Sequence, residues 1–211
     1  MIKLAPSILA ADPLNLERDV KKITEAGCDW IHVDVMDAHF VPNLAYTPDI
    51  VRRLREITSI PLDVHLMMSC PGTLMDAFLK AGADILTIHA EIDEPVAPLL
   101  EKIRENGAQA GLAIKPKTPA EAIRDLLPKT DLVLTMTVEP GFGGQTLDEH
   151  VPDKIRKIRD WGYTGWIEAD GGIRESNLGM LAACGLNVAV MGTALFRDSD
   201  PKSAMERMHR L

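Results

Sequence analysis

The sequence predicts an α/β protein folded as a single (β/α)8 barrel that spans residues 1–211. Short apolar segments alternate with amphipathic segments along the whole chain, which is typical of parallel strands joined by helices. The chain accommodates about eight such pairs of roughly 25 residues each, and eight is the number that closes a barrel. No linker or change of composition divides the sequence, so we expect one domain. A doubly wound open sheet is the main alternative, but it gives no reason for this number of units.

The expected strands are short segments in which apolar residues predominate. The segment at residues 30–37 is the most informative, because it places His32 and Asp34 among Ile31, Val33 and Val35. In chain order, the expected strands are residues 3–9, 30–37, 62–67, 85–89, 110–114, 132–136, 165–169 and 188–191.

Helices are expected where apolar residues recur every three or four positions and a glycine or proline marks an end. In the first of them Leu14, Val20 and Ile23 share one stripe, and Gly27 follows. Pro119 suits the first turn of another, where its missing N–H costs nothing. In chain order, the expected helices are residues 14–26, 48–57, 73–81, 96–106, 119–127, 151–161, 177–184 and 201–211.

Composition restricts the class of protein. Hydrophobic residues make up 46% of the chain, enough for a substantial core, and the net charge of −8 argues against nucleic-acid and membrane-surface binding. Cys28, Cys70 and Cys184 have no metal-binding spacing and suit a reducing compartment. No segment resembles a secretion signal, and no apolar run approaches ~20 residues. We therefore expect a cytoplasmic protein without a membrane partner.

A histidine and a carboxylate share one face of the second expected strand. Side chains two residues apart in a strand point the same way, so His32 and Asp34 lie together, opposite the aliphatic residues between them. Burying both groups costs several kcal/mol unless something compensates. A bound metal ion would compensate both at once.

Further polar residues stand where other expected strands end. His65 and Asp170 join His32 and Asp34 to give two imidazoles and two carboxylates, a set that suits zinc, iron(II), cobalt or manganese. The alternative is that each residue is a hydrogen-bonded core residue, and for His89 alone we prefer that interpretation. For the four together the cost of burial favours a metal site at the carboxyl ends of the strands.

Glycines follow the sixth, seventh and eighth expected strands. In barrels, loops at this end of the late strands commonly bind phosphate through backbone N–H groups, and glycine permits the close approach. Tight turns would explain any one glycine, but three adjacent glycine-bearing loops favour phosphate binding. The glycines concerned are Gly141, Gly143, Gly144, Gly171, Gly172 and Gly192.

Three methionines lie near the ends of the second, third and sixth expected strands. Met36, Met67 and Met136 could simply fill gaps in a core. Their position also suits an apolar cap that excludes water from a reactive intermediate over the metal.

Together these motifs resemble the ribulose-phosphate 3-epimerase family from the first strand to the last. The resemblance lies in Pro6-Ser7-Ile8-Leu9 and in HVDVMDAHFVPN, DVHLMM, MTVEPGFGGQ and EADGGI, which start at residues 32, 63, 136 and 168. It implies a cytoplasmic, homo-oligomeric (β/α)8 barrel of the pentose phosphate pathway. The implied reaction interconverts D-ribulose 5-phosphate and D-xylulose 5-phosphate through a metal-stabilised enediolate.

The resemblance also implies roles for residues of this chain. One divalent ion, Zn²⁺ or Fe²⁺ with Mn²⁺ or Co²⁺ as alternatives, would be bound by His32, Asp34, His65 and Asp170. Asp34 and Asp170 would be the paired acid and base, and the three methionines would form the cap. The phosphorylated ketose would be contacted by Ser7, His65, Gly141, Phe142, Gly143, Gly144, Gly171, Gly172, Gly192 and Thr193.

The chain departs from the family pattern in loops at the expected mouth of the barrel. Ala38 replaces a glycine, Lys117 replaces a small residue, Thr193 stands where serine is frequent, and Tyr46 lies in an altered segment. These changes leave a second substrate class open, a ketohexose 6-phosphate such as D-allulose 6-phosphate. A non-catalytic sugar-phosphate-binding barrel is the alternative of another class. A decarboxylase would carry a lysine among the strand-end acids, and the second-strand motif has none.

Overall fold

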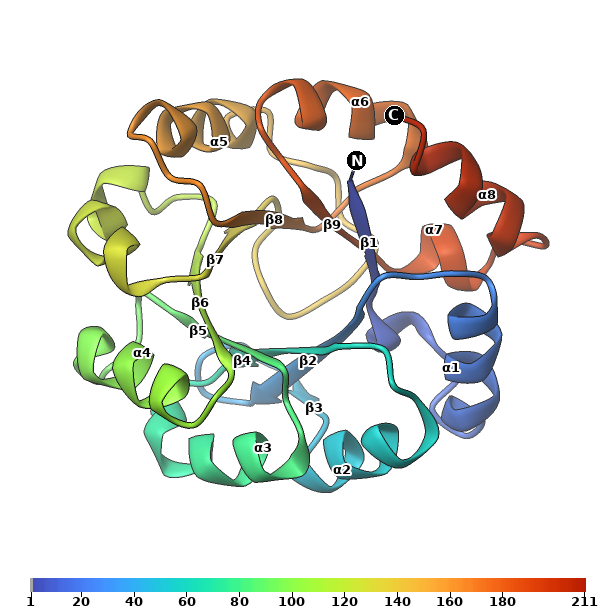
Figure 1. Ribbon diagram of the computed structural model, residues 1–211, viewed down its shortest axis with the longest axis horizontal. Helices are drawn as coiled ribbons and strands as arrows, with labels where there is room; N and C mark the ends of the chain where they lie inside the picture. The colour runs from blue at the N-terminus through green and yellow to red at the C-terminus, as the bar shows by residue number, and fades with distance from the viewer. Residues whose placement is uncertain (1) are drawn as a thin grey trace.

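A closed ring of parallel strands surrounded by helices forms the molecule (Figure 1), as a computed structural model that describes residues 2–211 shows. The strand order is β1-β9-β8-β7-β6-β5-β4-β2-β3, and among these described strands only β2 and β3 pair antiparallel. A bridge between Ser7 and His32 joins the regions of β1 and β2, and the Asp29 N–H donates to the Leu4 carbonyl. These contacts bring the first strand back to the second, as the predicted barrel requires.

The strands and helices alternate along the chain as predicted. The strands are β1 (Lys3–Pro6), β2 (Ile31–Asp37), β3 (Leu44–Ala45), β4 (Leu62–Met67), β5 (Ile85–His89), β6 (Gln109–Ile114), β7 (Leu132–Met136), β8 (Trp166–Asp170) and β9 (Val188–Met191). The α-helices are α1 (Leu16–Glu25), α2 (Pro48–Ile57), α3 (Met75–Ala81), α4 (Val96–Glu105), α5 (Val151–Asp160), α6 (Glu175–Ala183), α7 (Thr193–Phe196) and α8 (Pro201–Met208). The 3-10 helices are η1 (Ile8–Ala10), η2 (Pro71–Thr73) and η3 (Ala120–Lys129).

Two apolar layers hold the barrel together. The larger layer lies between the outer face of the sheet and the helices, and includes Val33, Leu66 and Phe78. The smaller one fills the barrel around Leu134 and Val190, with Trp30 packed edge-on against Trp166. His32 and Asp34 point inward while their strand neighbours pack outward, so the predicted alternation along β2 is confirmed.

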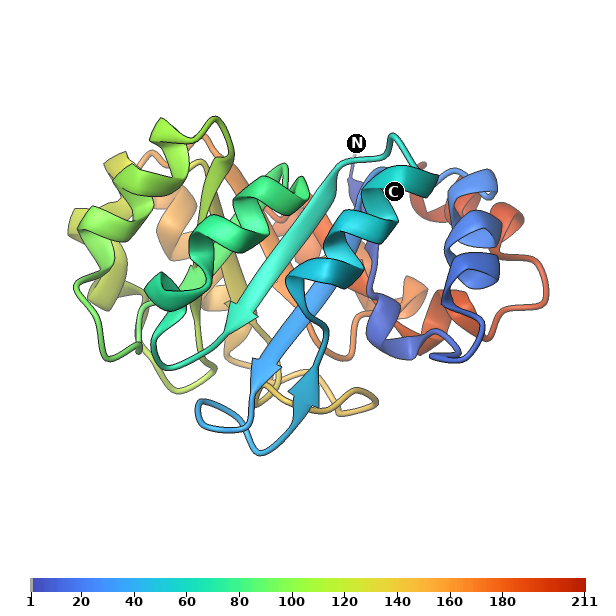
Figure 2. The ribbon, with the colours of Figure 1, turned by 90° about the horizontal axis from the view of Figure 1, so that it is seen from below.

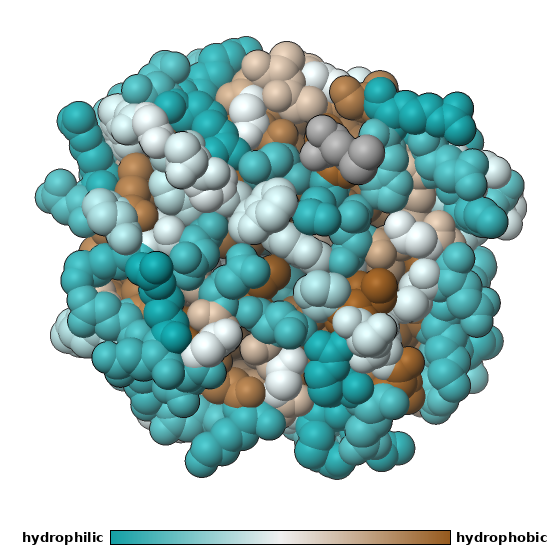
Figure 3. Space-filling view, in the orientation of Figure 1, coloured by the Kyte–Doolittle hydropathy of each residue, from teal (hydrophilic) through white to brown (hydrophobic). Residues whose placement is uncertain are grey.

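All the parallel strands present their carboxyl ends at one end of the barrel. In Figure 2 the arrowheads of β2 and β4 point down, towards the loops that follow β2 and β7. Figure 3 shows the opposite, amino-terminal face, where hydrophilic side chains surround small apolar areas. The predicted site residues stand at the carboxyl ends, which form the mouth of the barrel.

Several expected boundaries differ from the observed ones because local hydrogen bonds override apolar spacing. The strand expected at 3–9 ends at Pro6, because the Ser7 side chain caps η1 by accepting the Leu9 N–H. The first helix begins at Leu16, and Leu14 is 91% exposed, so its placement on the buried stripe was wrong. The segment expected as a helix at 119–127 is the 3-10 helix η3.

Besides the 3-10 helices η1 and η2, two short elements were not predicted. β3 pairs with the end of β2 and forms a hairpin whose turn contains Ala38, with Met36 opposite Ala45. α7 follows Gly192 directly after β9 and has only four residues. Both are too short to show a periodic apolar pattern in sequence.

Candidate active site

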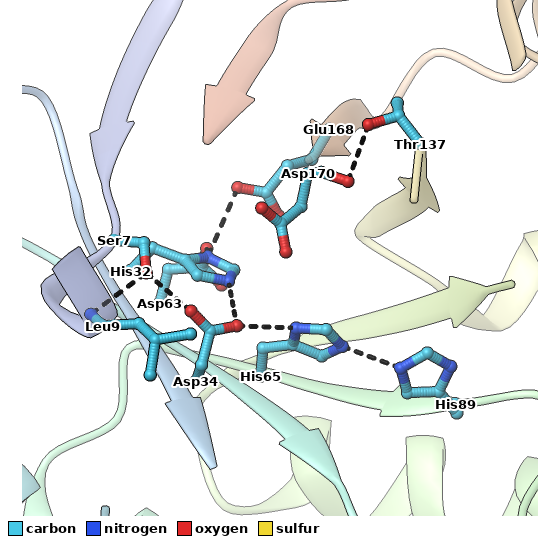
Figure 4. A network of polar contacts seen from close by, with 10 residues as sticks. All are labelled: Ser7, Leu9, His32, Asp34, Asp63, His65, His89, Thr137, Glu168 and Asp170. Atoms are coloured by element: carbon cyan, nitrogen blue, oxygen red, sulfur yellow. Dashed lines mark hydrogen bonds and ion pairs between the residues drawn. The ribbon is translucent and has the colours of Figure 1, made fainter. Parts of the chain in front are cut away.

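Four predicted side chains from three strands converge inside the mouth of the barrel (Figure 4). His32 and Asp34 come from β2, His65 from β4 and Asp170 from the end of β8. One ligand atom of each residue lies within 4.8 Å of all the others, as in a metal site. Parallel pairing explains this, because Asp34 is in register with His65 and both face inward.

The two histidines present unpaired ring nitrogens to the same carboxylate oxygen. His32 Nε2 lies 3.3 Å and His65 Nδ1 lies 3.4 Å from Asp34 Oδ1. Both nitrogens are buried and have no hydrogen-bond partner among residues 2–211. Orphaned buried polar atoms are costly, and a cation among these three atoms would satisfy them together. The donor set therefore fits a divalent metal ion.

Carboxylates below the site make it favourable for positive charge. His32 Nδ1 lies 2.5 Å from Asp63 Oδ2 and 3.8 Å from Glu168 Oε1. Burial by itself would lower the pKa of His32, but Asp63 and Asp34 outweigh it and raise that pKa well above its usual range. The position thus attracts either a proton or a metal ion at Nε2, while Nδ1 remains paired with Asp63.

The two carboxylates of the site have proton affinities shifted in opposite directions. Burial would raise the pKa of Asp34, but His32 and His65 outweigh it and lower that pKa far below normal. Ser7 Oγ also donates to Asp34 Oδ2 at 2.6 Å. Burial and the negative charge of Asp34 raise the pKa of Asp170 to about 7. One carboxylate is therefore ionised while the other can exchange a proton near neutral pH.

Several polar residues around the ligands were not singled out from the sequence. Asp63 and Glu168 are completely buried, and burial followed by repulsion from Asp63 raises the pKa of Glu168 well above normal. Each stands two residues before a predicted ligand, His65 or Asp170, and so shares its inward face. That spacing could have identified both residues.

His89 is a buried hydrogen-bonded residue, as predicted. Its Nε2 lies 2.8 Å from His65 Nε2, and its Nδ1 lies 3.1 Å from Glu91 Oε2. Burial lowers the pKa of His89 to about 4. Burial would raise the pKa of Glu91, but hydrogen bonds from His89, Thr118 and the Lys115 N–H hold it at about 2.

A cavity of about 760 Å³ opens above Asp34 and Asp170. Its walls bring together the predicted phosphate and cap residues, whereas His32 and His65 lie completely buried below it. That depth favours His65 as a ligand over its predicted contact with the sugar. The predicted lining residues are Ser7, Met36, Met67, Met136, Gly141, Phe142, Gly143, Gly144, Gly171, Gly172, Gly192 and Thr193.

The glycine loops pack against each other at the rim of this cavity. Gly172 has a φ of +62°, and a Cβ there would lie 2.7 Å from the Leu147 N and 2.8 Å from the Gln145 carbonyl oxygen. Only glycine fits this approach without displacing the loop after β7. Arg174 and Arg197, which were not predicted, also line the cavity and add positive charge.

Sequence comparison identifies the family. A model of the ribulose-phosphate 3 epimerase family matches residues 3–196. The chain belongs to the ribulose-phosphate 3-epimerase family. As a member of it, the protein is an enzyme of the isomerase class, a carbohydrate epimerase.

Curated relatives match over nearly the whole chain. The ribulose-phosphate 3-epimerase of Bacillus subtilis is 42% identical over 99% of this chain and 98% of its own length. The chloroplastic ribulose-5-phosphate-3-epimerase of Arabidopsis thaliana is 43% identical over 97% of this chain and 75% of its own. The Escherichia coli ribulose-phosphate 3-epimerase is 40% identical over 97% of this chain and 93% of its own.

Solved structures confirm the barrel fold. A 3-hexulose-6-phosphate synthase superposes with a TM-score of 0.71 at 16% identity, with 99% of each chain covered. A tryptophan synthase α-subunit mutant from Pyrococcus furiosus gives 0.73 at 17% identity, with 100% of each chain covered. At this identity the likeness concerns the fold alone. Within residues 2–211 there is no helix with the length and apolar character needed to cross a membrane.

Proposed function

We propose that this protein is a metal-dependent 3-epimerase that interconverts D-ribulose 5-phosphate and D-xylulose 5-phosphate. The observation that carries the proposal is the pair Asp34 and Asp170 on different walls of one cavity, beside two buried histidine nitrogens that have no hydrogen-bond partner among residues 2–211 (Figure 4). Simple sugar-phosphate binding would not need two carboxylates whose proton affinities are shifted in opposite directions. This argues against a non-catalytic binding barrel.

His32 Nε2, His65 Nδ1 and one oxygen each of Asp34 and Asp170 would hold one divalent cation. Two nitrogen and two oxygen donors suit Zn²⁺ or Fe²⁺, with Mn²⁺ or Co²⁺ as alternatives. When bound, such an ion would act as a Lewis acid on the substrate oxygens and offset the negative charge that develops when C3 loses its proton.

Asp34 and Asp170 would transfer the proton at C3. One carboxylate removes the C3 proton, and the other, protonated, delivers a proton to the opposite face of the planar centre that results. In the reverse reaction their roles exchange. Ser7, which donates a hydrogen bond to Asp34 Oδ2, keeps that carboxylate oriented and leaves Oδ1 facing the ligand nitrogens.

The rim of the cavity would bind the rest of the substrate. The loops at residues 141–144 and 171–172, with Gly192 and Thr193, would contact the phosphate through backbone N–H groups, assisted by the charge of Arg174 and Arg197. Met36, Met67 and Met136 are buried at the cavity wall and would exclude water from the reacting carbon.

Kinetics with two ketose phosphates test the proposal. Protein loaded with Zn²⁺, Fe²⁺, Mn²⁺ or Co²⁺ should epimerise D-ribulose 5-phosphate with a higher kcat/KM than D-allulose 6-phosphate, and lose activity after chelation. A preference for allulose 6-phosphate would replace the pentose by the hexose, in keeping with the altered Ala38 and Tyr46 at the mouth. Binding of both sugars without turnover of either would support a binding barrel instead.

A further inference from the structure

We propose that Glu91 is a positioning residue which, through His89, directs the lone pair of His65 Nδ1 into the metal site. The inference rests on the proposed metal site, but it concerns a carboxylate outside the ligand set. Glu91 follows β5 in a mouth loop and touches none of the four ligands directly. Its link to the site runs through one buried imidazole ring.

An uninterrupted row of polar atoms joins Glu91 to the site. Glu91 Oε2 lies 3.1 Å from His89 Nδ1, and His89 Nε2 lies 2.8 Å from His65 Nε2. On its other side the His65 ring presents Nδ1 to Asp34 Oδ1 at 3.4 Å. Figure 4 shows the His65 and His89 rings side by side along this row. His65 and His89 are completely buried, so water does not compete for their nitrogens.

The row has two proton arrangements, and only one permits metal binding. The two Nε2 atoms share one hydrogen bond, so one nitrogen donates and the other accepts. If His65 donates, its Nδ1 carries a lone pair, and His89 must hold its own proton on Nδ1. If His89 donates instead, the proton of neutral His65 moves to Nδ1 and blocks the metal site.

Glu91 selects the first arrangement because its carboxylate can only accept hydrogen bonds and it forms one with His89. Asp34 Oδ1 is an acceptor on the opposite side, but it lies 3.4 Å from His65 Nδ1, and that nitrogen has no hydrogen-bond partner among residues 2–211. Oε2 requires a proton on His89 Nδ1, which leaves His89 Nε2 as the acceptor for His65. The second oxygen, Oε1, accepts the Lys115 N–H at 2.8 Å and the Thr118 hydroxyl. These donors keep Glu91 ionised and fix its orientation, so the β6–η3 loop supports the tautomer of a ligand at some distance.

At the other ligand histidine, a carboxylate fixes the tautomer by direct contact. His32 has its own carboxylate, Asp63, at 2.5 Å from Nδ1, which leaves Nε2 for the metal. Pairing of a ligand histidine with a carboxylate is a general device for fixing its tautomer and raising its basicity. At His65 the carboxylate is Glu91, and it acts through the His89 ring instead of contacting the ligand histidine directly.

The sharpest test is Glu91→Gln. The amide has nearly the same shape but one acceptor and one donor, whereas the site requires acceptors on both sides. When the amide oxygen accepts the Lys115 N–H, the amide NH₂ group faces His89 Nδ1. His89 must then carry its proton on Nε2, which gives the second proton arrangement. We expect 10- to 100-fold weaker metal binding, measured by competition between Zn²⁺ and a chromophoric chelator. In metal-free protein, ¹⁵N NMR should show the His65 proton moved from Nε2 to Nδ1.

Glu94→Gln is the matched control. Glu94 lies in the same loop and accepts the Gly72 N–H at 2.8 Å, without a contact to the histidine row. It should keep wild-type Zn²⁺ affinity and the wild-type His65 tautomer. A loss of metal from both variants would indicate a general loop effect and overturn the relay.

The outcomes distinguish this inference from the proposed function. Wild-type protein that binds no metal, or His65→Ala protein that keeps full affinity, contradicts the proposed site. Wild-type binding with equal affinity in Glu91→Gln contradicts the relay alone. If Glu91→Gln does not fold, the wild-type spectrum still decides, because a His65 proton found on Nδ1 in metal-free protein would overturn the relay.

Discussion

At the residue scale, Asp34 and Asp170 show how one pocket gives two carboxylates different proton affinities. Asp34 is surrounded by His32, His65 and the Ser7 hydroxyl, all of which stabilise its charge. Asp170 faces Asp34 without a comparable set of donors, and its pKa rises to about 7. The same shift has a consequence for stability, because a carboxyl that binds a proton more tightly when folded destabilises the fold once it ionises.

We predict that Asp170→Asn makes metal-free protein less sensitive to pH. An unfolded Asp titrates near pH 4, so wild-type protein should lose the stability linked to Asp170 as the pH rises from about 4 to 7. The asparagine variant lacks this loss. Its advantage in free energy of unfolding should grow by about 3 kcal/mol over that range, because each pH unit between the two pKa values contributes at most about 1.4 kcal/mol, and then level off. Urea unfolding with chelator present measures it. Asp153→Asn, at an exposed position of α5, should show no such trend.

Ala38 illustrates a different residue-scale cost. It has a φ of +61° in the turn between β2 and β3, and its N–H donates to the Asn43 carbonyl. A left-handed conformation costs a non-glycine residue about 1–2 kcal/mol. Glycine avoids this strain, but it lowers stability by about 0.4–1 kcal/mol because it gives the unfolded chain more conformational entropy. Ala38→Gly should therefore stabilise the protein by about 0.5 kcal/mol in thermal or urea unfolding. Ala97→Gly, within helix α4, should destabilise it by about 1 kcal/mol, and stabilisation there would contradict the argument.

At the element scale, apolar spacing predicted every α-helix except the four-residue α7, because the longer helices pack an apolar stripe on the barrel. Val20 and Ile23 of α1 and Val51 and Leu54 of α2 are the buried residues of their helices. The same reasoning failed where hydrogen bonds of single side chains decide the structure. Ser7 ends the first strand early, although apolar residues continue after it. Such caps depend on local geometry that composition alone does not show.

The loops after β7 and β8 form one unit through Gly172. A methyl group there would collide with the backbone of residues 145–147, whereas Gly143 has open space around its Cα and no positive φ. Gly172→Ala should displace the loop after β7, raise the KM for ribulose 5-phosphate at least tenfold, and increase proteolytic cleavage within residues 137–150. Gly143→Ala should leave proteolysis unchanged. Equal behaviour of the two variants would show that the contact at Gly172 does not order the loop.

At the scale of the whole molecule, the barrel explains why much of the site was predictable. Parallel strands end at the same mouth, so strand-end residues of distant segments meet there, and His32, Asp34, His65 and Asp170 do so. The contacts among the buried polar residues beneath these four were harder to predict. Glu168 lies near Asp63 across the barrel, and His89 contacts His65 from the neighbouring strand, because the register of the strands sets the height of each residue. Sequence spacing fixes the face of a residue but not its partner across the barrel.

The packing of the whole barrel also determines cysteine reactivity. Cys28 and Cys184 are buried, whereas Cys70 is exposed, and burial raises the pKa of Cys28 to about 12. In native protein near pH 8, a thiol reagent such as dithionitrobenzoate should therefore titrate Cys70 rapidly and the other two only after unfolding. Cys70→Ser should abolish the rapid phase. A rapid phase of more than one thiol would contradict the packing of α1 or α6 against the barrel.

Proton exchange at C3 tests the central claim most directly. In D₂O, metal-loaded protein should convert D-ribulose 5-phosphate into D-xylulose 5-phosphate that carries solvent deuterium at C3, as ¹H NMR would show. Asp34→Asn and Asp170→Asn should each reduce this conversion by about 10³-fold, because each removes one of the two proposed proton-transfer groups. Product that retains its C3 hydrogen, or wild-type turnover by Asp170→Asn, would contradict proton transfer by these two carboxylates.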